Sequence, residues 1–162
     1  MKLRVKDVIS HMGQDFVVEA VLSYRLSGKV YPLVRAVDGI GASADVRWVE
    51  PLMDDVDDRL LLFTEVKDLD MATPPPATIS YRGGSYVPRL SGTGPVAVAG
   101  RAPDRPADGA HVSVWRYRAA GDLFLQIEKW QEWPDRTIVL AGESVHKGMV
   151  DVLPGPGKDA SK

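Results

Sequence analysis

The chain has 162 residues, and its 20 Lys and Arg against 22 Asp and Glu leave a formal net charge of −2. It contains no cysteine, which excludes disulfides, thiolate metal sites and cysteine nucleophiles. The near-neutral charge gives no reason to expect nucleic-acid binding, and no window approaches the ~20 apolar residues of a membrane-spanning helix. The opening MKLRVKDVIS has no apolar run of signal-peptide length, so we expect a cytoplasmic protein without membrane insertion.

Short apolar segments with a period of two follow one another along the whole chain. They are rich in Val, Leu and aromatic residues, and Gly, Asp or Pro separates them, as is usual between strands. The best helical alternative covers 56–69, but its Leu-Leu-Leu-Phe run also suits a buried strand. We predict strands over 15–24, 29–37, 45–52, 59–66, 78–82, 85–90, 95–100, 111–118, 123–130, 137–143 and 149–154.

The segment MATPPPAT, residues 71–78, predicts a linker, because its three prolines stiffen the chain and cannot donate to a β-ladder. It separates an N-terminal β half (1–70) from a C-terminal β half (79–153), and a tail (154–162) that we expect to be disordered follows. The predicted fold class is all-β, with two small SH3-like or barrel-like halves packed together and few or no helices.

The two halves share an order of strand, loop, strand, turn and strand, in 16–51 and again in 96–130. In a tandem repeat, Arg35 would correspond to Arg116, and Glu50 to Glu128. The alternative is that any two β-meanders look alike.

Turn residues indicate where the strands of the second half connect. Gly83–Gly84 suits the centre of a two-residue hairpin loop, and Gly121 suits a left-handed position after 111–118. The stretch SGTG, 91–94, resembles a turn between strands. Pro88 lies within a strand pattern, which predicts an edge strand.

Charge is uneven along the chain. Residues 50–70 hold eight acids and two bases, whereas residues 81–120 hold six arginines and two aspartates. The charges either belong to solvated loops, or the acidic segment docks on the basic half, or each segment recruits a partner. A basic patch is predicted at Arg82, Arg89, Arg116 and Arg118.

The sequence lacks the motifs of several common kinds of functional site. The run from Asp54 to Glu65 has Arg at the sixth position, where a calcium-binding EF-hand loop needs glycine. None of His11, His111 and His146 is spaced from another as paired metal ligands are, no glycine-rich segment has the P-loop pattern, and no serine sits in a nucleophile elbow. We therefore predict no metal, no cofactor and no catalytic residues.

The hairpin HVSVWRYRAAGDLFLQIEKW, 111–130, has apolar groups on both faces. A turn centred on Ala120–Gly121 would pair Arg118 with Leu123, and strand alternation then sorts the side chains into two faces. The predicted core face holds Val112, Val114, Arg116, Arg118, Leu123, Leu125, Ile127 and Lys129. The other face holds His111, Ser113, Trp115, Tyr117, Phe124, Gln126, Glu128 and Trp130.

The second of these faces either packs on the other half of the protein or binds something. As a site, its ring faces and a carboxylate would suit a protein partner or a cationic small molecule. The candidate binding residues are Trp115, Tyr117, Phe124, Trp130, Glu128 and His111.

Three segments resemble a known family: VKDVISHMGQDFVVEAVLSY (5–24), VWRYRAAGDLFLQIEKW (114–130) and VLAGESVHKGMVDVLPG (139–155). They are similar to the bacterial family called domain of unknown function 4178, and the similarity covers roughly residues 3–155. The resemblance implies a bacterial cytoplasmic protein without an assigned activity. Genes of this family are often found near those of spermidine-synthase-like aminopropyltransferases and small membrane proteins, which implies an accessory role linked to the cell envelope or to polyamines.

From the residues and the resemblance together we predict a non-enzymatic binding or adaptor module with a protein partner. The first alternative is a protein that binds a cationic, polyamine-like molecule through the aromatic face and Glu128. A third hypothesis is a hydrolase that uses Glu128, Glu143 and His146.

Overall fold

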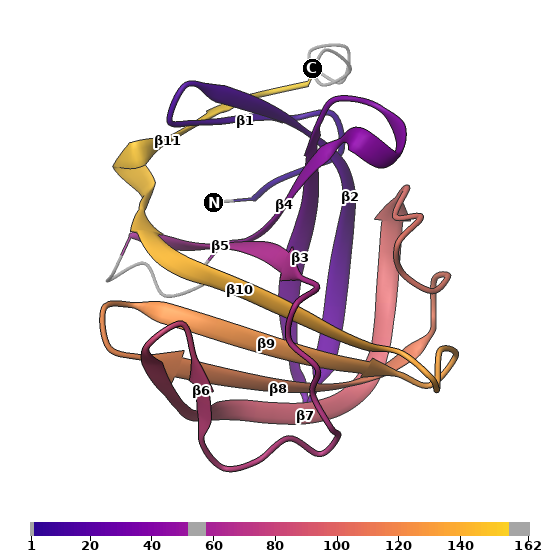
Figure 1. Cartoon of the computed structure of the whole chain (residues 1–162). Coiled ribbons are helices and arrows are strands. Elements are labelled where there is room, and N and C mark those ends of the chain that lie inside the picture. Colours follow the sequence, from indigo (N-terminus) through magenta and orange to yellow (C-terminus); the bar gives the residue numbers. More distant parts are fainter. Residues whose placement is uncertain (1, 52–57, 156–162) are drawn as a thin grey trace.

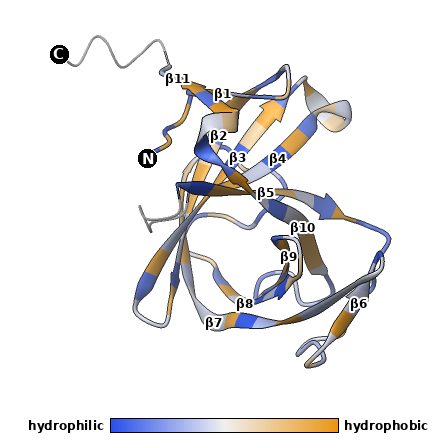
Figure 2. Cartoon of the chain, turned by 90° about the vertical axis from the view of Figure 1, so that its left-hand side faces the viewer, coloured by the Kyte–Doolittle hydropathy of each residue, from blue (hydrophilic) through white to orange (hydrophobic). Residues whose placement is uncertain are grey.

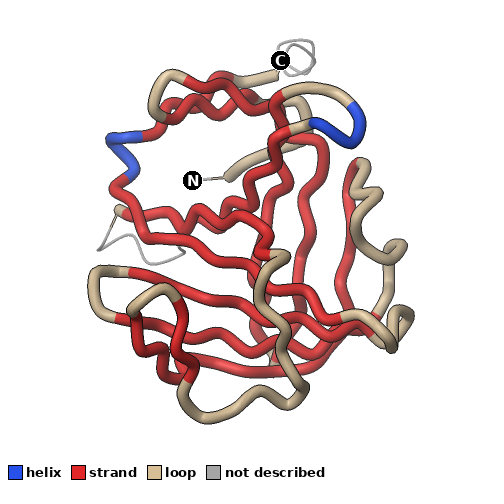
Figure 3. The backbone as a smooth tube through the Cα atoms, viewed as in Figure 1, coloured by secondary structure: helices blue, strands red, loops and turns tan. Residues whose placement is uncertain are grey.

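The computed structural model describes residues 2–51 and 58–155, and within them almost every segment is a strand or a connection between strands (Figures 1 and 3). Two short 3₁₀ turns, η1 (Gly41–Ser43) and η2 (Lys147–Met149), are the helical elements of this part of the chain. The strands are β1 (Val8–His11), β2 (Gln14–Leu26), β3 (Lys29–Asp38), β4 (Asp45–Pro51), β5 (Arg59–Val66), β6 (Ile79–Tyr81), β7 (Gly84–Gly100), β8 (His111–Ala119), β9 (Leu123–Trp130), β10 (Thr137–His146) and β11 (Val150–Leu153).

Eight of these strands close into a single antiparallel barrel. Their order is β2-β3-β4-β5-β10-β9-β8-β7, and β7 pairs back onto β2 through Val96–Gly100. Strands β1 and β11 extend the sheet beyond one end of β2, and β6 is added to the far end of β7. The all-β class is confirmed.

The prediction of two separate halves packed together is wrong. Each half supplies four consecutive barrel strands, but β5 pairs with β10 and β2 pairs with β7, so neither half closes by itself. The proline segment 71–78 joins β5 to β6 along the outside of the same barrel (Figure 1). In one closed eight-stranded sheet these strand edges are hydrogen-bonded to one another, whereas two separate half-barrels would each have left them unpaired.

The barrel interior is filled by side chains from every wall strand, alternating with those that face outwards. Trp48, Phe63, Leu140 and Trp130 are each at most 1% exposed and belong to this inner cluster. A second cluster lies between the outer face of the barrel and the added strands β1 and β11, and includes Ile9, Phe16 and Val150. A third lies beneath β6 and the segment before it, around Ile79, Tyr117 and Leu125.

Strand positions agree with the sequence pattern better than the turns do. The residues of SGTG, predicted as a turn, lie inside β7, which runs unbroken from Gly84 to Gly100. A Cβ added to Gly94 would lie 1.8 Å from the carbonyl oxygen of Arg25, so this glycine permits the close approach of β2 to β7. β1 was not predicted, and the predicted tail lies outside the described residues from 156 onwards.

Both predicted hairpin turns are displaced by one residue. Tyr81 pairs with Gly84, so the first loop is Arg82–Gly83, with φ of 47° and 79°. Ala119 pairs with Leu123, so the second loop has three residues, and both Gly121 and Asp122 have positive φ. Shifting a strand by one residue exchanges its two faces. The prediction therefore placed the side chains of β8 on the same face as the wrong set of β9 side chains.

Candidate functional site

The six predicted binding residues do not form one surface. Phe124, Glu128 and Trp130 point into the barrel with Val112 and Val114, and Glu128 is fully buried. Trp115 and Tyr117 belong to the cluster on the outside of the barrel. His111 is exposed at the start of β8. The structure therefore offers no accessible aromatic face that carries Glu128.

Glu128 instead lies at the centre of a hydrogen-bond network inside the barrel. Its Oε2 accepts from the hydroxyl of Tyr24 at 2.9 Å and from Nε2 of Gln126 at 2.8 Å. Its Oε1 accepts from Nε1 of Trp130 at 3.0 Å and from Nε of Arg105 at 3.2 Å. Four donors satisfy this carboxylate, as a charge without access to water requires.

Two buried arginines carry the positive charge of this network. Arg105 lies 4.3 Å over the ring of Trp48 and has an additional ion pair with Glu65 at 3.5 Å. Arg116 donates to both carboxylate oxygens of Glu50, at 2.7 and 2.6 Å, and also to Gln126. Such two-point binding is the strong form of the arginine–carboxylate interaction.

The pKa values of the network follow from burial and from these partners. Burial is the largest single influence and would lower the pKa of Arg105, but Glu128, Tyr24, Asp104 and Glu65 together outweigh it and raise that pKa. The pKa of Arg116 is likewise raised, because the charge and hydrogen bonds of Glu50, together with Glu128 and Tyr24, outweigh burial. Burial, and then the charge of Glu128, raise the pKa of Tyr24 well above its usual value of 10. The arginines are therefore charged and the tyrosine is neutral across the physiological range.

One end of the barrel is closed by the β7–β8 connection, residues 101–110. Its Arg105 enters the interior, and Asp104 accepts a 2.9 Å hydrogen bond from Nε of Arg35 on β3. Ala110 completes the inner cluster at this end. This connection and the side chain of Arg105 therefore act as a plug.

The opposite end of the barrel is open, and its cavity has a volume of about 800 Å³. We call this cavity the mouth. It is bounded by the start of β3, the end of β4, the start of β5 and the β8–β9 turn, and the Arg116–Glu50 pair forms part of its lining. Figure 2 is viewed from the side on which the β8–β9 turn lies. The mouth of a β-barrel is a common position for a ligand site.

In the part of the chain that the structure describes, five cationic and two anionic residues line the mouth. They are Lys29, Arg59, Arg89, Arg116 and Arg118, and Glu50 and Asp122.

Three of the four residues predicted as a basic patch, Arg89, Arg116 and Arg118, thus lie around the mouth, although Arg116 is buried. Arg82 lies elsewhere, at the β6–β7 turn, where it pairs with Asp68 at 3.6 Å.

The acidic and basic segments of the sequence contact one another. Within the described residues, three ion pairs connect them: Glu50 with Arg116, Glu65 with Arg105, and Asp68 with Arg82. The first half of the chain is therefore joined to the second by charge as well as by strand pairing. The run from Asp54 to Glu65 that was compared with an EF-hand lies partly outside the described residues, and its described part forms β5.

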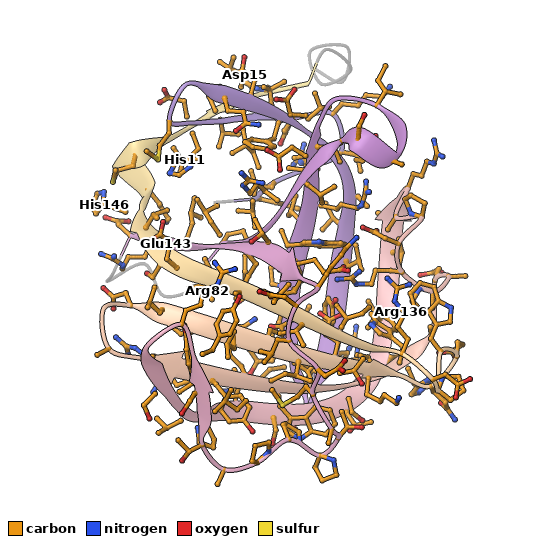
Figure 4. All side chains as sticks on the ribbon, in the orientation of Figure 1. His11, Asp15, Arg82, Arg136, Glu143 and His146 are labelled. Carbon is orange, nitrogen blue, oxygen red and sulfur yellow. The ribbon has the colours of Figure 1, made fainter. Side chains whose placement is uncertain are left out.

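A second concavity, of about 710 Å³, lies on the outside of the barrel over β5 and β10, between the β1–β2 and β6–β7 hairpins. His11, Arg82 and Glu143 line it, and Figure 4 shows all three on one side of the molecule. Its charges are mixed, so they favour no class of ligand.

The residues of the hydrolase hypothesis are divided by the barrel wall. Glu128 is buried inside the barrel, whereas Glu143 and His146 are exposed on β10 (Figure 4). Nδ1 of His146 accepts a hydrogen bond from the backbone N–H of Gly148 at 3.0 Å. In residues 2–51 and 58–155, no group of three or more His, Asp or Glu side chains could hold a metal ion. No described segment forms a helix long and apolar enough to cross a membrane.

Residues 4–147 match the family model described as a domain of unknown function, DUF4178. The chain belongs to the DUF4178 family. No curated protein and no solved structure shows significant similarity to it. The matched residues include all eight barrel strands, so the closed barrel and its mouth are features of the DUF4178 domain of this chain.

Proposed function

We propose that this DUF4178 protein is a non-enzymatic binding module and that the mouth of the barrel is its ligand site. The observation that carries the proposal is the asymmetry of the barrel: one end is plugged by residues 101–110, and the other opens into about 800 Å³. This volume is within the range of roughly 300–1,000 Å³ typical of small-molecule sites.

The interior supports binding rather than catalysis. Glu128 accepts four hydrogen bonds and has no access to solvent. Both carboxylate oxygens of Glu50 accept hydrogen bonds from the guanidinium of Arg116. A general acid or base must instead reach the reacting group directly or through one water. A fixed network of this kind gives the mouth a rigid base.

A protein partner fits the same site if it inserts a side chain. Val30, which lines the mouth, is 45% exposed, and Val87, on the adjacent part of β7, is 52% exposed. They offer apolar contacts around a polar cavity. The link to the cell envelope or to polyamines depends on the family resemblance alone and remains a prediction.

The proposal is tested by an NMR titration of the ¹⁵N-labelled full chain with one probe of each charge type: citrate, spermidine and trehalose. We expect at least one probe to shift amide signals at the β2–β3 turn, the start of β5 and the β8–β9 turn. A Leu90→Trp variant, which adds bulk to the mouth lining, should lose those shifts while keeping the spectrum of a folded barrel. A matched Thr64→Trp variant, on the outer concavity, should keep them.

If none of the three probes shifts mouth signals at millimolar concentration, the proposal is refuted. Shifts confined to the outer concavity over β5 and β10 would also refute it, because they would place the ligand outside the barrel.

A further inference from the structure

The charge balance of the mouth is opposite to that of the whole chain. Among the described residues that line it, five cations and two anions leave three positive charges, whereas the chain carries a net charge of −2. A concave site surrounded by low-dielectric walls concentrates the field of such charges. The described lining of the mouth therefore favours anions even though the protein as a whole is weakly acidic.

The cations differ in what they already bind. The guanidinium of Arg116 is held by Glu50 and Gln126. Arg59 and Arg118 share a single carboxylate, that of Asp122, at 3.5 and 2.9 Å. Two arginines with one acid between them leave one positive charge uncompensated.

Among the described lining residues, Lys29 and Arg89 are the cations whose head groups have no described protein partner. Both are exposed, both line the mouth, and neither makes a side-chain hydrogen bond or ion pair within the described part of the chain. A ligand can bind a positive side chain that has no protein partner in a concave site without first breaking an ion pair.

Arg89 also owes its position to an irregularity of the strand. In the β7–β8 ladder Pro88 pairs with Tyr117 and Leu90 pairs with Arg116, so Arg89 is an extra residue with no partner on β8. A bulge of this kind changes the direction of a side chain relative to the regular strand. Arg89 is thereby placed in the lining of the mouth beside the Arg116 position.

We propose that the mouth binds its ligand through a carboxylate or phosphate group, with Arg89 and Lys29 as the charge partners and the Arg116–Glu50 pair kept intact beneath it. Guanidinium and ammonium groups are the usual partners of these oxyanions. Among the described residues that line the mouth, the two carboxylates, those of Glu50 and Asp122, are both paired and therefore not free for a cationic ligand. The inference depends on the proposed function, namely on the mouth being the ligand site.

The test titrates the full chain at low ionic strength with inorganic phosphate, with citrate, with a hexaglutamate peptide and with spermidine. We expect at least one of the three anions to shift mouth signals, including the side-chain Nε–H of Arg89. Arg89→Glu and Lys29→Glu should each weaken that anion about tenfold or more, the effect of losing one charge-assisted hydrogen bond. Arg101→Glu makes the same charge change at the plugged end, and binding should be within about twofold of the parent.

The outcomes separate the two proposals. Binding of phosphate, of citrate or of the peptide, lost in Arg89→Glu, supports the inference and identifies the source of the oxyanion as inorganic, small organic or peptide. Shifts at the mouth with spermidine but with none of the anions would overturn the inference and leave the mouth as the ligand site. Anion binding that Arg101→Glu weakens as much as Arg89→Glu does would also overturn it, because that result indicates only the overall charge.

Discussion

Replacing Glu128 with glutamine removes the negative charge at the centre of the barrel while keeping the size of the side chain. Arg105, whose side chain is fully buried, would then keep Glu65, 3.5 Å away, and the charge of the neighbouring Asp104 as counter-charges. Breaking a buried ion pair by removing one partner costs about 3–5 kcal/mol. The amide NH₂ of glutamine would also face two donors that now contact a carboxylate oxygen, and each unsatisfied donor adds a penalty.

We therefore expect Glu128→Gln to lower the free energy of unfolding by about 3–5 kcal/mol, a large part of the roughly 5–15 kcal/mol that stabilises a typical domain. Urea unfolding followed by tryptophan fluorescence measures this loss, and the midpoint should fall by more than about 1 M for an m-value of about 1–3 kcal/mol/M. The matched control is Glu143→Gln, on the outer surface, which should change stability by no more than about 0.5 kcal/mol.

A loss below about 1 kcal/mol in Glu128→Gln would refute the assignment of Glu128 as the counter-charge of Arg105. A double-mutant cycle gives a second criterion. Arg105→Met combined with Glu128→Met should be less destabilising than the sum of the two single changes by at least about 1 kcal/mol, because the double change leaves neither charge buried without its partner. Additive losses would show that the two residues do not interact.

Three further predictions concern other parts of the barrel. The pKa of Tyr24 is raised in the folded state, so the stability that this residue contributes is complete below about pH 10 and is lost at higher pH. Tyr24→Phe should therefore flatten the fall of the unfolding free energy between about pH 9 and pH 11. An unchanged slope would contradict this. Gly94→Ala places a Cβ 1.8 Å from the carbonyl oxygen of Arg25, so thermal unfolding should show a loss of about 3 kcal/mol or more, whereas a neutral effect would exclude such a close approach of β2 and β7. Tyr117→Phe removes the 2.6 Å hydrogen bond to the carbonyl of Pro76, so stability should fall by about 1 kcal/mol and amide exchange should accelerate in the 71–78 segment but not in the barrel wall.

The strand content of this protein could be predicted from sequence because its signal is local. The ranges 59–66 and 123–130 coincide with β5 and β9, where alternating or continuous apolar residues end at turn-forming ones. A strand such as β1, with only four residues between its turns, carries too short a pattern to be found.

The candidate site was less accessible to sequence reasoning. Glu128, Arg89 and Arg116 stood out in the sequence, but as parts of an exposed face or a surface patch rather than of a buried network and a barrel mouth. Arg105 and Tyr24 were missed, because nothing around them distinguishes a buried polar group from an exposed one. A single residue in the β8–β9 turn decided the outcome, since it determines whether Glu128 shares a face with Val114 or with Trp115.

What the sequence determined by itself is therefore the all-β class, the positions of most strands and the absence of cysteine chemistry. The tertiary structure decided that the strands form one barrel, which end of it is open and which charges meet inside. Tyr24 and Glu128 are 104 positions apart, and Arg116 and Glu50 are 66 apart. The alternation of a strand is set by neighbouring residues, whereas the partner of a buried charge is set by sheet register and barrel closure, which depend on the whole chain.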